Sequence, residues 1–224
     1  RPCIVTAIDQ RIKVTVTRIQ TTEFILHAPE VHLPNYSVPI AELRTNTPKG
    51  ALFLETLYAH FLERFPQIGG IEIQTTSDFN SSFGFGSSSA STVAFCRGLS
   101  ELFEILLTKK ELFDLCYQTV LSVQGVGSGF DIASAIWGGT IYYVKPASVV
   151  EQLDAKEMPL IVGYTGIKAD TATLIKQVAD QRNKHFAEVE KIFDQIADIT
   201  ESAQLAISGE DWSQTGQLMN SQHK

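Results

Sequence analysis

The chain has 224 residues, 44% of them hydrophobic and 19% charged, a composition that excludes a disordered protein and allows a sizeable core. Its formal net charge of −7 argues against nucleic acid or an anionic membrane surface as the main partner. The three cysteines are scattered and have no paired spacing, which favours buried thiols over a disulfide framework or a zinc site. No apolar run approaches the roughly 20 residues that a membrane span needs, so we expect a cytoplasmic protein.

The first third of the chain predicts short strands and one helix. Residues 28–47 are rich in proline and asparagine and are expected to form a loop. A helix is expected over 50–64, because Pro66 and a Gly-Gly pair follow it. Four segments either alternate apolar and polar residues or are continuously apolar, and we expect them to be strands: 2–8, 13–19, 24–26 and 71–75. The first three are expected to form one antiparallel sheet.

The middle of the chain contains two glycine-rich loops, each of which leads into a helix. The first loop, at 84–90, is expected to open a helix over 88–107. Thr108 and Glu111 have the spacing of a capping box and predict the start of the next helix. The second loop, at 124–131, precedes a short helix, a Gly-Gly turn and a strand. The helix between the loops carries an apolar stripe made of Leu112, Leu115, Cys116, Thr119, Val120 and Val123.

A break in composition at 146–159 is the candidate boundary between two domains. We therefore expect an N-terminal domain over 1–150 and a C-terminal domain over 151–224. The elements expected in the second domain are a strand over 159–165, a helix capped by Asp170 and reaching Arg182, and a long amphipathic helix over 185–207.

The first loop, GFGSSSA, has the composition of an anion site. Gly84 and Gly86 let the backbone approach a phosphate closely and adopt positive φ angles. Amide groups at the start of the following helix can point at the anion, and a serine hydroxyl there can bind Mg²⁺. The loop lacks the Gly-Lys-Ser/Thr ending of a P-loop, and a plain capped turn is the alternative interpretation.

The second loop, QGVGSGFD, ends in a carboxylate. Asp131 follows Gly127, Ser128 and Gly129 at the expected start of a helix. Phosphoryl transfer to an alcohol requires a group in such a position, which orients the hydroxyl and accepts its proton. Aspartate is also a common helix cap with no other role. Taken together, the two loops favour a kinase.

These motifs resemble those of the GHMP kinase superfamily, which includes galactokinases, homoserine kinases, mevalonate kinases and phosphomevalonate kinases. GFGSSSA is similar to their phosphate loop GLGSSAA, and QGVGSGFD to their substrate loop, which ends in the catalytic aspartate. GYTGIKADT at 163–171 and GQLMNSQH at 216–223 resemble segments of mevalonate kinases. The resemblance covers most of the chain and implies an α+β, two-domain GHMP kinase fold, with an N-terminal domain like domain 2 of ribosomal protein S5 and a truncated, ferredoxin-like C-terminal domain.

The same resemblance implies ATP and Mg²⁺ as cofactors and a role for each matched residue. Ser88 would bind Mg²⁺, and Asp131 would be the catalytic base for the substrate hydroxyl. Gly127, Ser128 and Gly129 would contact the substrate, and Thr171 would lie near it. The residues that would surround the phosphates of ATP are Gly84, Phe85, Gly86, Ser87, Ser88, Ser89 and Ala90.

Several positions depart from the family pattern. Asn80 stands where a proline is usual, and Ser82 where a glycine is usual. Mevalonate kinases place a Mg²⁺-binding glutamate eleven residues before the catalytic aspartate, where this chain has Val120. The metal would then have fewer protein ligands, with water completing its shell. The superfamily's Pro-Gly-Lys segment and GAGGGG loop are both absent, so we expect the sequence to be a fragment of a longer kinase.

The expected function is an ATP-dependent transferase that phosphorylates the hydroxyl of mevalonate in isoprenoid precursor synthesis. QGVGSGFD is closer to the phosphomevalonate kinases, so phosphomevalonate is an alternative acceptor. A non-catalytic ligand sensor is an alternative of another class, favoured by Val120 and opposed by the retained Ser88 and Asp131. We expect a small-molecule partner and neither nucleic acid nor membrane, and leave a homodimer open.

Overall fold

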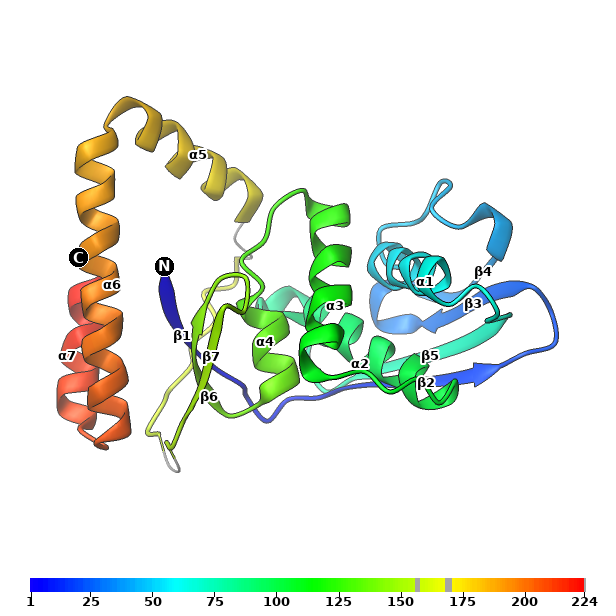
Figure 1. Cartoon of the computed structure of the whole chain (residues 1–224), viewed down its shortest axis with the longest axis horizontal. Coiled ribbons are helices and arrows are strands. Elements are labelled where there is room, and N and C mark those ends of the chain that lie inside the picture. Colours follow the sequence, from blue (N-terminus) through cyan, green and yellow to red (C-terminus); the bar gives the residue numbers. More distant parts are fainter. Residues whose placement is uncertain (156–157, 168–170, 224) are drawn as a thin grey trace. The chain divides into compact units, whose positions relative to one another are not determined.

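The computed structural model of the chain describes residues 1–155, 158–167 and 171–223. These residues form two compact units, whose elements are labelled in Figure 1. The four-stranded unit comprises Asp9–Ile136, and the three-stranded unit comprises Arg1–Ile8 with Trp137–Lys224. Among the helices of the described ranges, none combines the length and the apolar character that crossing a bilayer would require.

The sheet of the four-stranded unit has the order β2-β5-β3-β4. Its central pair, β3 and β5, is parallel, whereas the outer pairs are antiparallel. Ile71, Ile73 and Thr75 of β5 are buried while the residues between them are exposed, so one face of the sheet carries the core and the other faces solvent. The strands are β2 (Ile12–Arg18), β3 (Glu23–Ala28), β4 (Leu33–Pro39) and β5 (Ile71–Ser77).

Helices cover the buried face of this sheet, and their contacts make the core. The α2 helix packs on β2, where a Cβ atom on Gly98 would lie 2.9 Å from Cγ2 of Val16. The ring of Phe24 lies 5.6 Å from that of Tyr58 on α1 and 6.4 Å from that of Phe95 on α2, and all three rings are fully buried. The helices of this unit are α1 (Leu52–Arg64), α2 (Ser87–Leu102), α3 (Lys109–Gln124) and α4 (Phe130–Trp137), the last ending at the edge of the unit.

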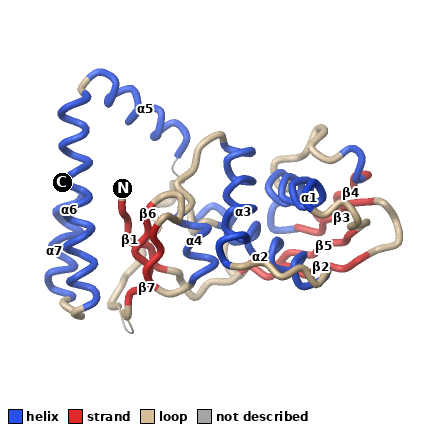
Figure 2. The backbone as a smooth tube through the Cα atoms, viewed as in Figure 1, coloured by secondary structure: helices blue, strands red, loops and turns tan. Residues whose placement is uncertain are grey.

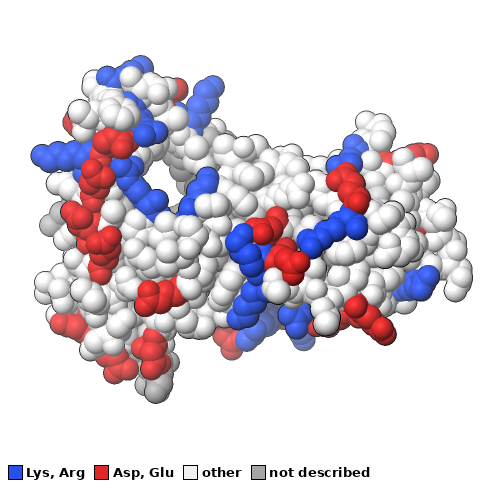
Figure 3. Space-filling view, in the orientation of Figure 1, with Lys and Arg blue, Asp and Glu red and all other residues white. Residues whose placement is uncertain are grey.

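The three-stranded unit combines an antiparallel sheet of order β1-β6-β7 with three helices (Figure 2). Arg1 attaches the sheet to α6, since its guanidinium lies 2.8 Å from Glu190, 3.0 Å from Asp194 and above the ring of Phe193. Acidic side chains gather along α6 (Figure 3), and the hydrogen bond from Arg1 lowers the pKa of Glu190. The elements are β1 (Pro2–Thr6), β6 (Thr140–Val144), β7 (Val149–Leu153), α5 (Thr171–Lys184), α6 (Phe186–Ser208) and α7 (Trp212–His223).

The strand pairing corrects the predicted N-terminal sheet. The three predicted strands exist, but β1 pairs with β6, whereas β2 and β3 lie on either side of β5. The predicted loop over 28–47 contains β4, together with the short 3-10 helices η1 (Pro29–Val31) and η2 (Ile40–Glu42). Pro34 and Pro39 are compatible with β4 because it is an edge strand, which pairs with β3 on one side alone.

One predicted helix end and one predicted strand are also wrong. The helix after the first loop ends at Leu102 and not at residue 107, because Glu104 adopts a φ of +56° that a helix cannot continue through. Residues 159–165 form no strand: no described strand pairs with them, and Ile161 is 96% exposed.

Other predictions from the sequence have mixed outcomes. The predicted domain boundary between residues 150 and 151 falls inside β7, and the division into two domains stays a prediction. Asp170, the predicted cap of α5, lies outside the described residues. All three cysteines are free thiols; Cys96 and Cys116 are buried as predicted, while Cys3 is partly exposed.

Candidate active site

The first glycine-serine loop connects β5 to α2 and is braced by three phenylalanine rings. The ring of Phe85 lies 5.7 Å from that of Phe79 and 5.8 Å from that of Phe83. Asn80 begins the 3-10 helix η3 (Ser81–Phe83) by accepting a hydrogen bond from the amide of Ser82 at 2.9 Å. The two residues that depart from the family pattern therefore contact each other. Sequence reasoning missed the aromatic brace, although three phenylalanines within seven residues were its signal.

The loop ends in backbone conformations that only glycine adopts easily. Gly84 has a φ of +79° and Gly86 a φ of +72°, both in the left-handed region. Gly86 is the N-cap residue of α2 and provides no side chain to cap it. The amides of Ser87, Ser88 and Ser89 therefore remain as hydrogen-bond donors at the positive end of a 16-residue helix. This arrangement suits an anion such as a phosphate group.

The three serines of the loop have different surroundings. The Ser89 side chain is buried, and its hydroxyl donates a hydrogen bond to Oδ2 of Asp131 at 2.6 Å. Within the described part of the chain, the half-buried hydroxyls of Ser87 and Ser88 have no hydrogen-bond partner. Ser87 and Ser88 are thus available to a ligand, whereas Ser89 is already engaged.

The second loop follows α3 and packs against that helix. The hydroxyl of Tyr117 donates a hydrogen bond to the carbonyl of Gly127 at 3.1 Å. A Cβ atom on Gly127 would lie 3.1 Å from Cγ1 of Val120, so the loop backbone rests directly on the valine. Ser128 is half-buried, and Gly129 is buried with a φ of +83°. A side chain at 127 would therefore require Val120 to shift by a few tenths of an ångström, and the loop leads directly into α4.

Asp131 lies where the two loops meet. Its Oδ2 accepts the hydrogen bond from Ser89, and its Oδ1 accepts one from the amide of Ile132 at 3.1 Å. A Cβ atom on Gly86 would lie only 3.5 Å from Cβ of Asp131. The segments 84–90 and 124–131 contain no lysine or arginine, so the positive N-terminal ends of α2 and α4 are their own sources of positive potential. A phosphate-type loop and a carboxylate thus share one location within the four-stranded unit.

Thr171 belongs to the other unit. It is the exposed first residue of α5, and the preceding residues of the predicted GYTGIKADT motif, 168–170, lie outside the described residues. Its role near a substrate stays a prediction.

The oxygen donors at the junction suit Mg²⁺ only together with a phosphate ligand. Val120 is an apolar side chain that is 5% exposed, so α3 offers no carboxylate at this point. Across the described ranges, no group of three or more histidine, cysteine, aspartate or glutamate side chains is placed to hold a metal. Ser88 Oγ remains as a donor. Mg²⁺ commonly combines one or two protein ligands with water and substrate phosphates, so this donor set fits it.

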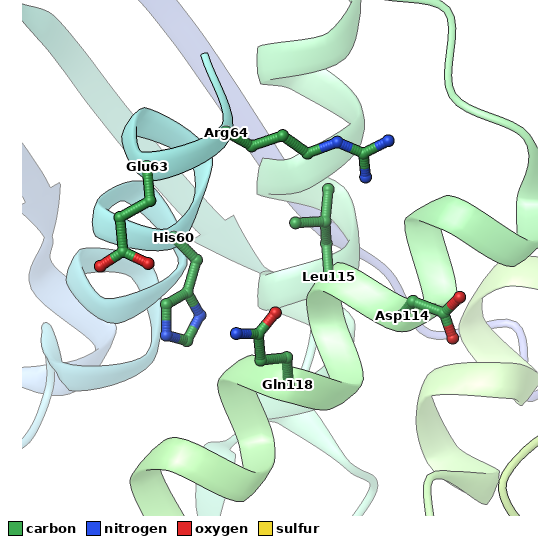
Figure 4. A pocket seen from close by; sticks show the side chains of 6 residues that line it. All are labelled: His60, Glu63, Arg64, Asp114, Leu115 and Gln118. Atoms are coloured by element: carbon green, nitrogen blue, oxygen red, sulfur yellow. The ribbon is translucent and has the colours of Figure 1, made fainter. Parts of the chain in front are cut away.

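A separate hollow of about 300 Å³ lies between α1 and α3 (Figure 4). Its charged side chains are already paired: Arg64 with Glu111 at 3.0 Å, Asp114 with Lys110, and Glu63 with Arg44. None of the residues predicted to form a site lines it, and we therefore place the candidate active site at the two loops. The residues lining the hollow are His60, Glu63, Arg64, Asp114, Leu115 and Gln118.

Comparison with known proteins identifies the family of the chain. The family described as "GHMP kinases N terminal domain" matches residues 51–139, a span that includes both loops. A mevalonate kinase from Thermococcus sibiricus is 30% identical over 239 residues, which cover all of this chain and 70% of that protein. The chain belongs to the GHMP kinases. It is accordingly a kinase, a phosphotransferase that uses ATP and a small-molecule substrate.

Solved structures of GHMP kinases share the fold. The L. major mevalonate kinase in complex with R-mevalonate gives a TM-score of 0.70 at 22% identity and covers 99% of this chain and 67% of that one. The Streptococcus pneumoniae phosphomevalonate kinase in complex with phosphomevalonate and AMPPNP gives a TM-score of 0.71 at 12% identity, covering 98% and 71%. The predicted superfamily and fold class are therefore confirmed.

Proposed function

We propose that this GHMP kinase transfers the γ-phosphoryl group of ATP to the hydroxyl of mevalonate, as a step of isoprenoid precursor synthesis. The observation that carries the proposal is the contact between the two loops, in which Ser89 Oγ lies 2.6 Å from Asp131 Oδ2. A base held beside a phosphate-type helix start is the arrangement that phosphoryl transfer to an alcohol requires. The mevalonate kinase from T. sibiricus, which aligns with the whole chain, supports mevalonate as the acceptor.

The first loop would bind the triphosphate. The amides of Ser87, Ser88 and Ser89 would donate to phosphate oxygens, and the glycines on either side of Phe85 leave the backbone accessible. Ala90 closes the first turn of α2, its amide donating to the carbonyl of Gly86 at 2.9 Å. Ser88 would be the hydroxyl ligand of Mg²⁺, which neutralises phosphate charge when it is bound.

Asp131 would act on the acceptor. Its carboxylate takes the proton of the attacking hydroxyl while the oxygen forms a bond to the γ-phosphorus and the bond from that phosphorus to the bridging oxygen breaks, leaving ADP. Each carboxylate oxygen accepts one hydrogen bond from the protein, which leaves a lone pair for this proton. The loop of Gly127, Ser128 and Gly129 would contact the acceptor, with Thr171 as a further candidate. Residence in the cytoplasm and a homodimer stay predictions.

Phosphomevalonate is the second candidate acceptor, because the QGVGSGFD loop is closer to the phosphomevalonate kinases in sequence. The acceptor loop contains no cation to pair with an additional phosphate group, which favours the uncharged hydroxyl end of mevalonate. The two acceptors predict different products from the same assay.

The test is ATP turnover by the full-length protein, offered mevalonate and phosphomevalonate in parallel, with and without Mg²⁺. We expect Mg²⁺-dependent turnover of mevalonate, and a loss of roughly 100-fold or more in kcat for Asp131→Asn with ATP binding retained. Turnover of phosphomevalonate alone would transfer the assignment to that acceptor. Unchanged turnover in Asp131→Asn would remove Asp131 from the chemistry, and ATP binding without turnover of either acceptor would favour a ligand sensor.

A further inference from the structure

Ser89 differs from the two serines before it in what it contacts. Its side chain is only 2% exposed, and its hydroxyl donates to Oδ2 of Asp131 at 2.6 Å. That length is typical of an O–H group bound to a charged carboxylate, which is about twice as strong as a neutral hydrogen bond. Burial also leaves the hydroxyl little access to bulk water that would compete for the carboxylate. Ser89 is thus committed to the aspartate.

The carboxylate is held from both sides as a result. The amide of Ile132, on the same helix as Asp131, donates to Oδ1 at 3.1 Å, while Ser89 donates to Oδ2 from the first turn of α2. With one donor on each oxygen, rotation of the carboxylate about its own axis would break both hydrogen bonds. The plane and direction of the carboxylate are therefore fixed by two helix starts.

We propose that Ser89 is a positioning residue for Asp131, a role that rests on the proposed kinase function. It holds the carboxylate so that its remaining lone pairs face an acceptor hydroxyl next to the phosphate loop. The matching position of the GLGSSAA motif is an alanine, so the motif does not account for this hydroxyl. A misplacement of a catalytic group by about 1 Å can lower a rate by about 100-fold, which is why such a contact affects catalysis.

The positions 89 and 91 allow a matched comparison. Ser91 lies on the same helix, and its hydroxyl donates to a backbone carbonyl, that of Ser88, at 3.0 Å. We expect Ser89→Ala to lower kcat roughly 10- to 100-fold while the KM values and the equilibrium affinity for ATP change less than about threefold. Ser89→Thr, which retains the hydroxyl, should recover most of the rate, and Ser91→Ala should leave all these quantities near those of the unaltered protein.

A crystal structure of the Ser89→Ala protein provides a readout that does not depend on turnover. We expect the Asp131 carboxylate to rotate away from its position or to occupy more than one orientation. In the Asp131→Asn background, Ser89→Ala should cause no further loss of rate, because its effect passes through the carboxylate. If the unaltered protein turns over neither acceptor, the proposed function fails, and the crystal structures still decide whether Ser89 fixes Asp131.

Three results would overturn the inference. The first is an unchanged kcat in Ser89→Ala, and the second is an Asp131 carboxylate that keeps its orientation without the hydroxyl. The third is a weaker affinity for ATP at constant kcat, which would make Ser89 a nucleotide-binding residue.

Discussion

At the scale of single residues, Gly86 lies next to Asp131 at the start of α2. Gly84 and Gly86 both have left-handed backbones, so an alanine at either position costs about 1–2 kcal/mol of strain. Their surroundings differ: a Cβ atom on Gly84 would meet nothing within 4 Å, whereas one on Gly86 would lie 3.5 Å from Cβ of Asp131. The pair therefore separates the effect of backbone strain from the effect of a methyl group in contact with Asp131.

We expect Gly86→Ala to lower kcat/KM at least about tenfold more than Gly84→Ala, because only its methyl group would contact Asp131 and could displace the carboxylate. Urea unfolding should show that both variants lose similar stability, which makes Gly84→Ala the control. Equal losses of kcat/KM in the two variants would show that strain in the loop, and not the contact with Asp131, limits catalysis.

At the scale of elements, α3 begins with a complete capping box. Thr108 Oγ1 accepts from the amide of Glu111 at 3.2 Å, and Glu111 Oε2 accepts from the amide of Thr108 at 2.9 Å. Thr108→Ala should lower the free energy of unfolding by about 0.5–2 kcal/mol, as loss of a cap usually does. Urea unfolding measures this, with Gln124→Ala at the exposed other end of α3 as a control that should change stability by less than about 0.5 kcal/mol.

Thr108→Ser provides the conservative comparison. Serine is at least as good an N-cap residue as threonine, so this variant should keep the stability that the alanine variant loses. Equal stability of the Ser and Ala variants would mean that α3 is held by its packing against α1 and α2 and not by its cap.

Local signals explain why some elements could be predicted from the sequence and others could not. The capping box of α3 and the stripe of α6 are patterns within one segment, and both helices are found where the sequence predicts them. The edge strand β4 was missed because its prolines and asparagine are typical of loops, and only pairing with β3 makes it a strand. The partner of β1 is β6, more than a hundred residues away, and no local pattern encodes that pairing.

The same limit applies to the candidate site. The glycines and serines of both loops, and Asp131, could be chosen from residue types and from their resemblance to family motifs. The hydrogen bond between Ser89 and Asp131 could not, since it joins the starts of two helices that α3 separates in the chain. The support of Gly127 by Val120 also required the structure, because the sequence shows only an unexpected valine.

At the scale of the whole molecule, two histidines of the four-stranded unit give stability opposite dependences on pH. His60 is buried against α3, and burial lowers its pKa from 6.5, an effect that Glu63 opposes and Arg44 reinforces. Its Nδ1 lies 3.2 Å from the hydroxyl of Thr119, which itself donates to a carbonyl and so must accept from the ring. Nδ1 of His60 therefore carries a proton, and the lowered pKa favours the neutral ring over the charged one.

His27 lies on the solvent-facing side of the sheet and behaves in the opposite way. Hydrogen bonds to the carbonyl of Pro34 and to Glu72 raise its pKa above 6.5. Its contribution to stability is thus complete below pH 6.5 and is lost as the pH rises through its folded pKa. The contribution of His60 is complete above pH 6.5 and is lost as the pH falls through its folded pKa, because the unfolded chain then binds the extra proton.

Replacing each histidine with glutamine should separate the two effects in urea unfolding between about pH 5 and pH 8. His60→Gln should remove a loss of stability on acidification below pH 6.5, so the variant becomes relatively more stable toward pH 5. His27→Gln should remove the opposite dependence and be destabilised most at acidic pH. Titration of Glu111 does not affect the measurement between pH 5 and pH 8. Hydrogen bonds from Thr108 lower the pKa of Glu111, so its contribution to the free energy of unfolding is lost only below about pH 4.5. A pH dependence that His60→Gln leaves unaltered would show that His60 is protonated without cost in the folded unit.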